Sequence, residues 1–214
     1  VAEVRRRIDS GELGDVLYAY AQRLNLGRFR RDSDVVWTLA PHDVSILNYW
    51  FGAVPVQVSA RGMVLIHKDT EIPEVAFCQL DYPDGRIAHL HLSWLDPQKR
   101  REIVVVGSDK MLIYDDINSD RHIQIYDKSV AVDFQGELKD FADFSTRVRA
   151  GDLVVPNIRL QEPLATEVEA FVEAVATGKP PPTDGRHGLE VVAILEAISD
   201  SMARDGEIVD VGYP

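Results

Sequence analysis

The feature that most constrains this fold is a dense series of short β-strand patterns between residues 54 and 127. From Ile87 to Trp94 every second residue is apolar, which is typical of a strand with one buried face. Turn-forming sequences such as Tyr-Pro-Asp-Gly at 82–85 separate the strands, and short connections favour antiparallel neighbours. The spacing therefore predicts a meander of about six strands in an open, mainly antiparallel β-sheet.

The residues before this sheet, 1–53, predict a helix, a strand and a second helix. Branched and aromatic residues over 16–26 predict the strand, and residues 27–40 are predicted to form a loop. Pro41 favours the first position of a helix, and Gly52 is expected to end that helix.

The residues after the sheet, 128–214, predict two further helices and a final strand. An apolar stripe at helical spacing ends at Gly178, and Asp184 is expected to cap the second helix. A short strand is predicted over 208–211. Helices packed on one face of an antiparallel sheet give an α+β fold, and we expect residues 1–214 to form one domain.

Charge and composition exclude several classes of protein. The net charge of -12 argues against a nucleic-acid partner, and the single cysteine excludes an internal disulfide. No apolar run reaches the roughly 20 residues that a membrane span needs, so we expect a cytoplasmic protein without a membrane partner. Residues 1–31 carry seven basic and four acidic side chains, which favours an anionic ligand there.

His42 and Asp43 are the first candidates for chemistry, because they follow Pro41 in the predicted first turn of a helix. Free backbone N–H groups there disfavour an imidazolium, so His42 would stay neutral and able to accept a proton near pH 7. In the alternative interpretation, Asp43 only complements the helix dipole and His42 fills a polar gap.

His89 and His91 are candidates for a metal site, because they project from the same face of one predicted strand. A third ligand would have to come from His67, Glu74 or Asp81 on another segment. The sequence does not fix that geometry, and a polar sheet face or a subunit contact is the favoured interpretation.

A basic loop and a basic turn offer weaker signals. Arg28, Arg30 and Arg31 could bind a phosphate, although from these residues alone a solvated loop is the favoured interpretation. The basic run 99–101 is interpreted as protection of a sheet edge. No glycine-rich dinucleotide or phosphate-binding motif occurs, so no cofactor-binding residue is assigned to this chain.

Four segments in order identify a family. They are IDSGELGDVLYAYAQRLNLG, VVWTLAPHDVSILNYWFG, LHLSWLDPQKRREIVVVGSDKMLIYDD and EPLATEVEAFVEAVATGKPPPTDGRHGLEVVAILEAISDSM. Together they resemble the C-terminal, substrate-binding half of the Gfo/Idh/MocA oxidoreductases over nearly the whole chain. The phrases SWLDPQKRR and WTLAPHDVSIL look most similar to members that act on sugar nucleotides.

The resemblance implies an N-terminal Rossmann domain that binds NAD or NADP and is absent from this chain. It also implies hydride transfer between the nicotinamide and a sugar carbon that bears a hydroxyl or a ketone. His42 matches the family's catalytic histidine beside the nicotinamide. The family's lysine partner belongs to a Glu-Lys-Pro motif that would precede this chain, so we expect the chain alone to be inactive.

The family's substrate cleft implies further residues in this chain. The position four before His42, commonly an aspartate in the family, is Thr38 here, and a hydroxyl carries no charge. Arg23 and Asn25 match positions that face the cleft in similar members, although a structural role for Arg23 is an alternative. The expected substrate-binding residues are Thr38, Asp43, Arg23, Asn25 and Arg28.

Three hypotheses follow. The first is the substrate-binding portion of an NAD(P)-dependent sugar or sugar-nucleotide oxidoreductase, expected to form a homodimer or homotetramer through the sheet face. The second is a free-standing, non-catalytic sugar-binding or scaffolding module that dimerises through its sheet. The third, ranked last, is a metal-dependent isomerase or hydrolase that uses His89 and His91.

Overall fold

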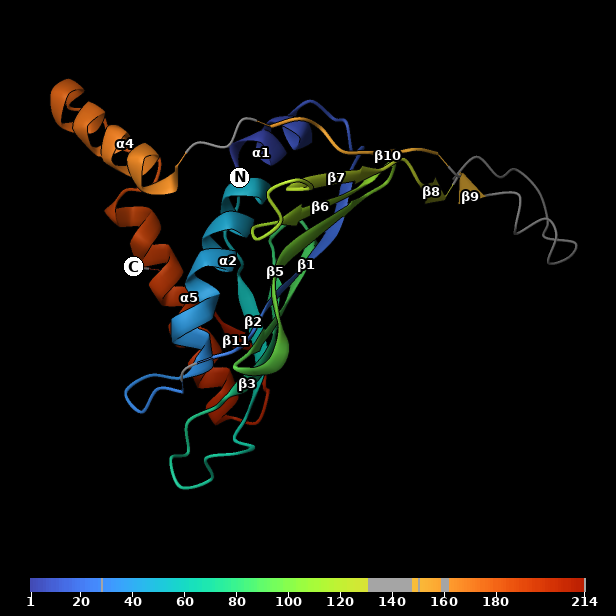
Figure 1. The fold of residues 1–214 in the computed structure, drawn as a ribbon. Helices are drawn as coiled ribbons and strands as arrows, with labels where there is room; N and C mark the ends of the chain where they lie inside the picture. Colours follow the sequence, from blue (N-terminus) through green and yellow to red (C-terminus); the bar gives the residue numbers. More distant parts are fainter. Residues whose placement is uncertain (28, 131–147, 150, 159–161, 214) are drawn as a thin grey trace, which may run out of the picture.

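The computed structural model describes residues 1–27, 29–130, 148–149, 151–158 and 162–213. A nine-stranded sheet forms one layer, and helices α2 and α5 cover one of its faces (Figure 1). The sheet runs in the order β10-β7-β6-β5-β1-β4-β3-β2-β11, and β8 pairs with β9 in a separate two-stranded sheet. This is the expected α+β fold with an open, mainly antiparallel sheet.

The elements have the following bounds. The helices are α1 (Ala2–Asp9), α2 (Val35–Phe51), α4 (Pro163–Thr177) and α5 (Gly185–Ala203). The first strands are β1 (Val16–Leu26), β2 (Gln57–Met63), β3 (Val75–Asp81), β4 (Ile87–Ser93), β5 (Leu95–Gly107) and β6 (Met111–Asp115). The remaining strands are β7 (Ile123–Tyr126), β8 (Ser129–Val130), β9 (Val148–Arg149), β10 (Leu153–Val154) and β11 (Val209–Asp210).

Strand β1 interrupts the predicted meander. It pairs in parallel with β4, where Ala21 lies opposite Leu90, and antiparallel with β5, where Ala21 lies opposite Ile103. Strands β4 and β5 are consecutive in the chain but are separated in the sheet by β1. The expectation that every short connection joins neighbouring strands was therefore wrong at this one point. The parallel pairing of β1 with β4 makes the sheet mixed.

Helix α2 begins six residues earlier than the sequence predicted. The carboxylate of Asp34 accepts hydrogen bonds from the backbone N–H groups of Val36 and Trp37, which caps the helix at its true start. Pro41 lies inside the helix, where it lacks an N–H to donate to the preceding turn. The prediction of a helix starting at Pro41 was wrong, because the Asp34 cap and the buried residues before Pro41 outweigh that loss.

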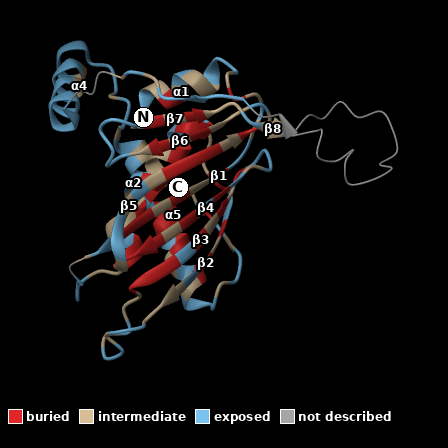
Figure 2. Cartoon of the chain, turned by 45° about the vertical axis from the view of Figure 1, so that its right-hand side comes forward, coloured by how far each residue is buried: buried red, intermediate tan, exposed pale blue. Residues whose placement is uncertain are grey.

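The core lies between the sheet and helices α2 and α5. Figure 2 shows buried residues along the middle of the strands and on the helix sides that face them. Alternate residues of β4, such as Leu90 and Leu92, are fully buried against this layer, and Ile194 and Ile198 of α5 are equally buried. The predicted cap of α5 is confirmed, since the Asp184 carboxylate accepts from the backbone N–H of His187.

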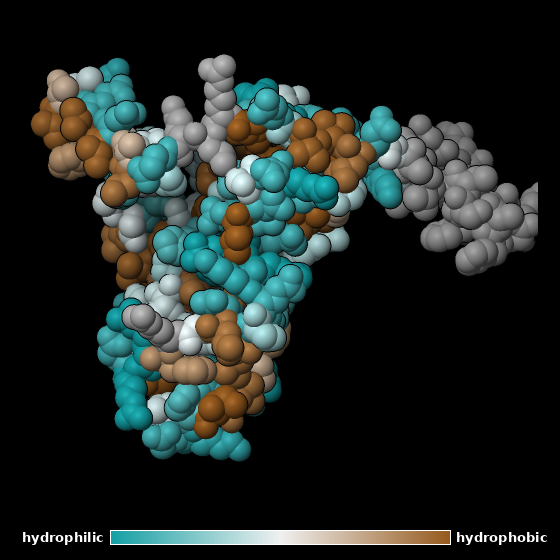
Figure 3. Space-filling model, in the orientation of Figure 1, coloured by the Kyte–Doolittle hydropathy of each residue, from teal (hydrophilic) through white to brown (hydrophobic). Residues whose placement is uncertain are grey.

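Helix α4 has the predicted amphipathic stripe, but that stripe is not covered. Its large apolar side chains are all exposed, and none of its residues is buried. They appear as brown atoms on the helix that projects from the top left of Figure 3. They are Leu164, Val168, Phe171, Val172 and Val175. In the described part of the chain, no helix is both long and apolar enough to cross a membrane.

Candidate functional site

A cavity of about 1260 Å³ opens along one side of α2. The helix contributes His42, Ser45, Ile46 and Tyr49 to its wall. These residues lie three or four positions apart, so they occupy one face of the helix. Further wall residues come from α1, β1, β5, β6 and α5. Segments distant in the sequence therefore meet around the histidine that the sequence singled out.

His42 lies about two helical turns after the start of α2, not in its first turn. The predicted reason for the neutrality of His42, a position in the first turn of the helix, was therefore wrong. Burial at the cavity wall lowers the pKa of His42, and the positive charge of Arg23 lowers that pKa further. The imidazole is thus neutral near pH 7 for a different physical reason, and it can accept a proton from a bound hydroxyl.

Arg23 and Asp43 form a buried ion pair next to this histidine. Their side chains are 8% and 2% exposed, and Nη2 of Arg23 lies 2.7 Å from Oδ1 of Asp43. Arg23 Nε donates to both carboxylate oxygens of Asp43, at 3.1 and 3.0 Å. Burial raises the pKa of the Asp43 carboxyl, and the pair with Arg23 opposes that shift. Arg23 reaches the cavity wall, whereas Asp43 lies behind it.

A second polar group on the cavity wall was not singled out from the sequence. Tyr114 of β6 donates to Oδ1 of Asp116 at 3.2 Å, and Oδ2 of Asp116 lies 3.7 Å from Nη1 of Arg101. His122 packs edge-on against the Tyr114 ring at 4.8 Å. Burial and the negative charge of Asp116 raise the pKa of Tyr114, so its hydroxyl keeps its proton. The basic run that contains Arg101 is in the interior strand β5, so its interpretation as edge protection was wrong.

Helix α5 contributes a further histidine to the cavity wall. His187 Nε2 lies 2.8 Å from the hydroxyl oxygen of Ser45, one turn after His42 on the same face of α2. The cavity wall is therefore lined by hydroxyl, imidazole, guanidinium and carboxylate groups, alongside apolar residues such as Ile46. This mixture suits a ligand that carries several hydroxyl groups on an apolar ring.

Other predicted site residues are not brought into this cavity. The Thr38 hydroxyl donates back to the backbone carbonyl of Asp34 at 3.0 Å, and Asn25 is exposed near the end of β1. Arg30 and Arg31 line a separate cavity of about 190 Å³ that shares no wall residue with the first. Arg28 lies outside the described residues.

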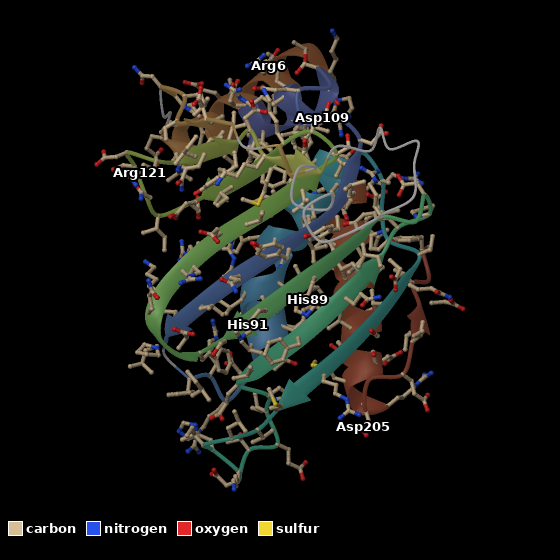
Figure 4. All side chains as sticks on the ribbon, turned by 90° about the vertical axis from the view of Figure 1, so that its right-hand side faces the viewer. Arg6, His89, His91, Asp109, Arg121 and Asp205 are labelled. Carbon is tan, nitrogen blue, oxygen red and sulfur yellow. The ribbon has the colours of Figure 1, made fainter. Side chains whose placement is uncertain are left out.

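The histidines of β4 lie on the outer face of the sheet, turned away from α2. Figure 4 shows His89 and His91 side by side on this face. Glu74, one of the possible third ligands, instead accepts hydrogen bonds from the backbone and ring of His67. Within the described ranges, no group of three His, Cys, Asp or Glu side chains could hold a metal ion.

Comparison with known proteins places this architecture in a family. The model of the GFO/IDH/MocA C-terminal domain matches residues 1–113. The UDP-N-acetylglucosamine 3-dehydrogenase of Acidithiobacillus ferrooxidans is 26% identical over 177 residues, which are 82% of this chain and 51% of that protein. This chain thus spans about half the length of that relative.

Solved structures share the fold at low sequence identity. Aldose-aldose oxidoreductase from Caulobacter crescentus, crystallised with glycerol, superposes with a TM-score of 0.75 and 15% identity, over 98% of this chain and 59% of that chain. Levoglucosan dehydrogenase in complex with NADH and levoglucosan superposes with a TM-score of 0.73 and 16% identity, over 99% and 62%. The family match over residues 1–113 and these shared folds agree, and the chain belongs to the GFO/IDH/MocA family of oxidoreductases.

Proposed function

We propose that this chain forms the substrate-binding side of an NAD(P)-dependent oxidoreductase that moves a hydride to or from a carbon of a sugar or sugar nucleotide. The observation that carries the proposal is His42, a histidine with a lowered pKa in the wall of a large cavity lined by hydrogen-bonding groups. Family membership supplies the oxidoreductase class, and the cavity supplies a place for the substrate.

The proposed chemistry divides one alcohol oxidation between two groups. Oxidation of a secondary hydroxyl to a ketone removes a hydride from carbon and a proton from oxygen. A nicotinamide cofactor supplies the acceptor of the hydride, or its donor in the reverse direction. Neutral His42 accepts a hydrogen bond from the reacting hydroxyl and takes its proton, and the imidazolium returns that proton when the ketone is reduced.

Arg23 and Asp43 support this role, and of the two only Arg23 reaches the cavity in which the substrate would lie. The buried carboxylate holds the guanidinium in one orientation, and the guanidinium disfavours a second positive charge on His42. Arg101, Tyr114 and Asp116 offer both donors and an acceptor to further hydroxyl groups of the ring. We propose that these three residues orient the sugar relative to His42.

The cavity has room for a nicotinamide ring beside a sugar. A volume of about 1260 Å³ exceeds the roughly 300–1000 Å³ of a typical small-molecule site, so a sugar and a second ring can share the cavity. The chain has no glycine-rich loop at a helix start to hold a pyrophosphate. The dinucleotide would therefore be held by another domain, as in the proposed two-domain enzyme.

The direct test uses the full product of the gene. Its mass is measured first, and its binding of NAD(H) and NADP(H) is measured by fluorescence titration. Oxidation of UDP-N-acetylglucosamine, levoglucosan and free aldoses is then followed by absorbance of the reduced cofactor. Cofactor binding and turnover of one of these sugars are expected. A 24.0 kDa product without cofactor binding would contradict the proposal and favour the non-catalytic module.

We also propose that two copies of the chain pair through the outer face of the sheet. That face carries exposed Tyr18, Phe77 and Ile87, whereas α2 and α5 cover the opposite face. Within the described part of the chain no helix covers this outer face, and an exposed cluster of large apolar side chains is typical of a surface that binds another protein.

A further inference from the structure

Ser45 and His187 form a hydrogen-bonded pair in the cavity wall that the proposed proton transfer does not use. Both residues are half-buried, and the Ser45 hydroxyl oxygen lies 2.8 Å from Nε2 of His187. Ser45 follows His42 by three residues in α2, so the two lie on one face of the helix with a rise of about 4.5 Å between them. That rise is comparable to the width of a sugar ring, so one ring can contact both groups.

The start of α5 fixes the position of His187. The Asp184 carboxylate accepts a hydrogen bond from the backbone N–H of His187 at 2.9 Å, which places His187 in the first turn of α5. Helix α5 in turn packs against both α2 and β2. The fold therefore holds the imidazole of His187 beside Ser45 before any ligand binds.

Two polar groups of the cavity wall lie on opposite sides of α2. Arg101 and Asp116 come from β5 and from the end of β6, which follow β1 on one side of the sheet. His187 comes from α5, which packs over β2 near the other edge. Helix α2 lies between them, over β1 and β4. A ring whose reacting carbon is at His42 therefore has one flank toward Arg101 and the other toward His187.

A serine paired with an imidazole can bind a hydroxyl group in either direction. When the Ser45 hydroxyl donates to Nε2 of His187, its oxygen is free to accept from the ligand. When Nε2 carries the proton and donates to Ser45, the Ser45 hydroxyl is free to donate to the ligand. A ligand hydroxyl is both a donor and an acceptor, so it satisfies either arrangement.

A charged substituent is disfavoured on this flank. Glu190 follows His187 by three residues in α5 and also lines the cavity. Its carboxylate repels a phosphate or a carboxylate placed beside His187, but it does not repel an uncharged hydroxyl. The chemistry of this flank is therefore that of a hydroxyl-binding subsite.

We infer that Ser45 and His187 bind the hydroxyl group on a ring carbon next to the carbon whose own hydroxyl reacts at His42. The inference rests on the proposed oxidoreductase function and names two residues that select its substrate. Neither residue takes the reacting proton, and the contact is the same in the bound substrate and in the transition state. The contact therefore lowers KM and leaves kcat unchanged.

The test is steady-state kinetics of the full gene product with its cofactor and with whichever of D-glucose, levoglucosan and UDP-N-acetylglucosamine it oxidises. In Ser45→Ala and in His187→Leu, KM is expected to rise about tenfold, the effect of one lost hydrogen bond, with kcat and Tm unchanged. The double variant should show no further rise, because both changes remove the same contact. The matched controls Ser199→Ala and His89→Gln, outside this cavity wall, should keep the wild-type KM.

Monodeoxy analogues of the same sugar separate substrate binding from a structural role. With the analogue that lacks the neighbouring hydroxyl, the wild type and Ser45→Ala should have the same KM, because the contact is missing from both. A KM that rises equally with the parent sugar and with every analogue shows that Ser45 acts through the fold, and this result overturns the inference.

Failure of the inference differs from failure of the proposed function. A wild-type KM in both single variants overturns the inference, while the oxidoreductase function stands. A lower kcat with unchanged KM places the pair in the proton transfer and also overturns the inference. A full gene product that oxidises none of the three sugars overturns the proposed function and the inference with it.

Discussion

Replacement of Asp43 by asparagine tests the buried ion pair on which the geometry of the site depends. Asparagine keeps the shape of the side chain but removes its charge, so Arg23 is left buried without a counter-ion. Breaking such a pair costs about 3–5 kcal/mol of folding free energy. For a chain of this size that corresponds to a fall in Tm of roughly 6–20 °C.

Equilibrium urea unfolding of the wild type and the Asp43→Asn variant measures this cost. The double variant Arg23→Met/Asp43→Val is the matched control, because it replaces both charges with apolar groups of similar combined volume. It should lie within about 1 kcal/mol of the wild type or exceed it. A loss below about 1 kcal/mol in Asp43→Asn would falsify the reasoning, since it would mean that water reaches Arg23.

Three further predictions concern stability and reactivity. Burial would raise the pKa of Glu74, but hydrogen bonds from Ile66, His67 and Leu65 lower it to about 2. The ionised Glu74 therefore stabilises the fold above about pH 4.5, and this stabilisation is lost as the pH falls toward 2. Acid unfolding followed by circular dichroism should show this loss in the wild type but not in Glu74→Gln. Burial raises the pKa of Cys78 to about 12, so the native chain should react with a thiol reagent such as dithionitrobenzoate only after unfolding, and prompt reaction would contradict its placement. A Cβ at Gly107 would collide with the backbone oxygen of Leu13, so Gly107→Ala should lower the Tm by several degrees, and an unchanged Tm would show that this contact can relax.

Much of the fold could be predicted from local patterns. The bounds of β1 were predicted correctly, because eleven consecutive residues favour a strand between clear turn signals. The cap of α5 at Asp184 was also predicted, since an aspartate before an apolar helical stripe is a strong local signal. The start of α2 was missed because two local rules compete there, and the cap at Asp34 prevails over the preference of Pro41 for a first turn.

The features that the sequence could not give depend on contacts between distant segments. Nothing local shows that β1 lies between β4 and β5, because the parallel pairing of β1 with β4 joins residues far apart in the chain. His42 was found from its motif, but Arg101 and Asp116 were not. They reach the same cavity only because β5 and β6 pair next to β1. No local signal marks these two as site residues.

The most direct test of the central claim is the turnover of a His42→Asn variant of the full gene product, assayed with the sugar and cofactor that the wild type uses. Asparagine can accept a hydrogen bond but cannot take a proton at neutral pH. We expect kcat to fall by about 10²–10⁴-fold with cofactor binding unchanged. The control Lys99→Gln, on an exposed part of β5, should keep wild-type turnover. A His42→Asn enzyme with wild-type kcat would contradict the claim that this histidine carries the proton.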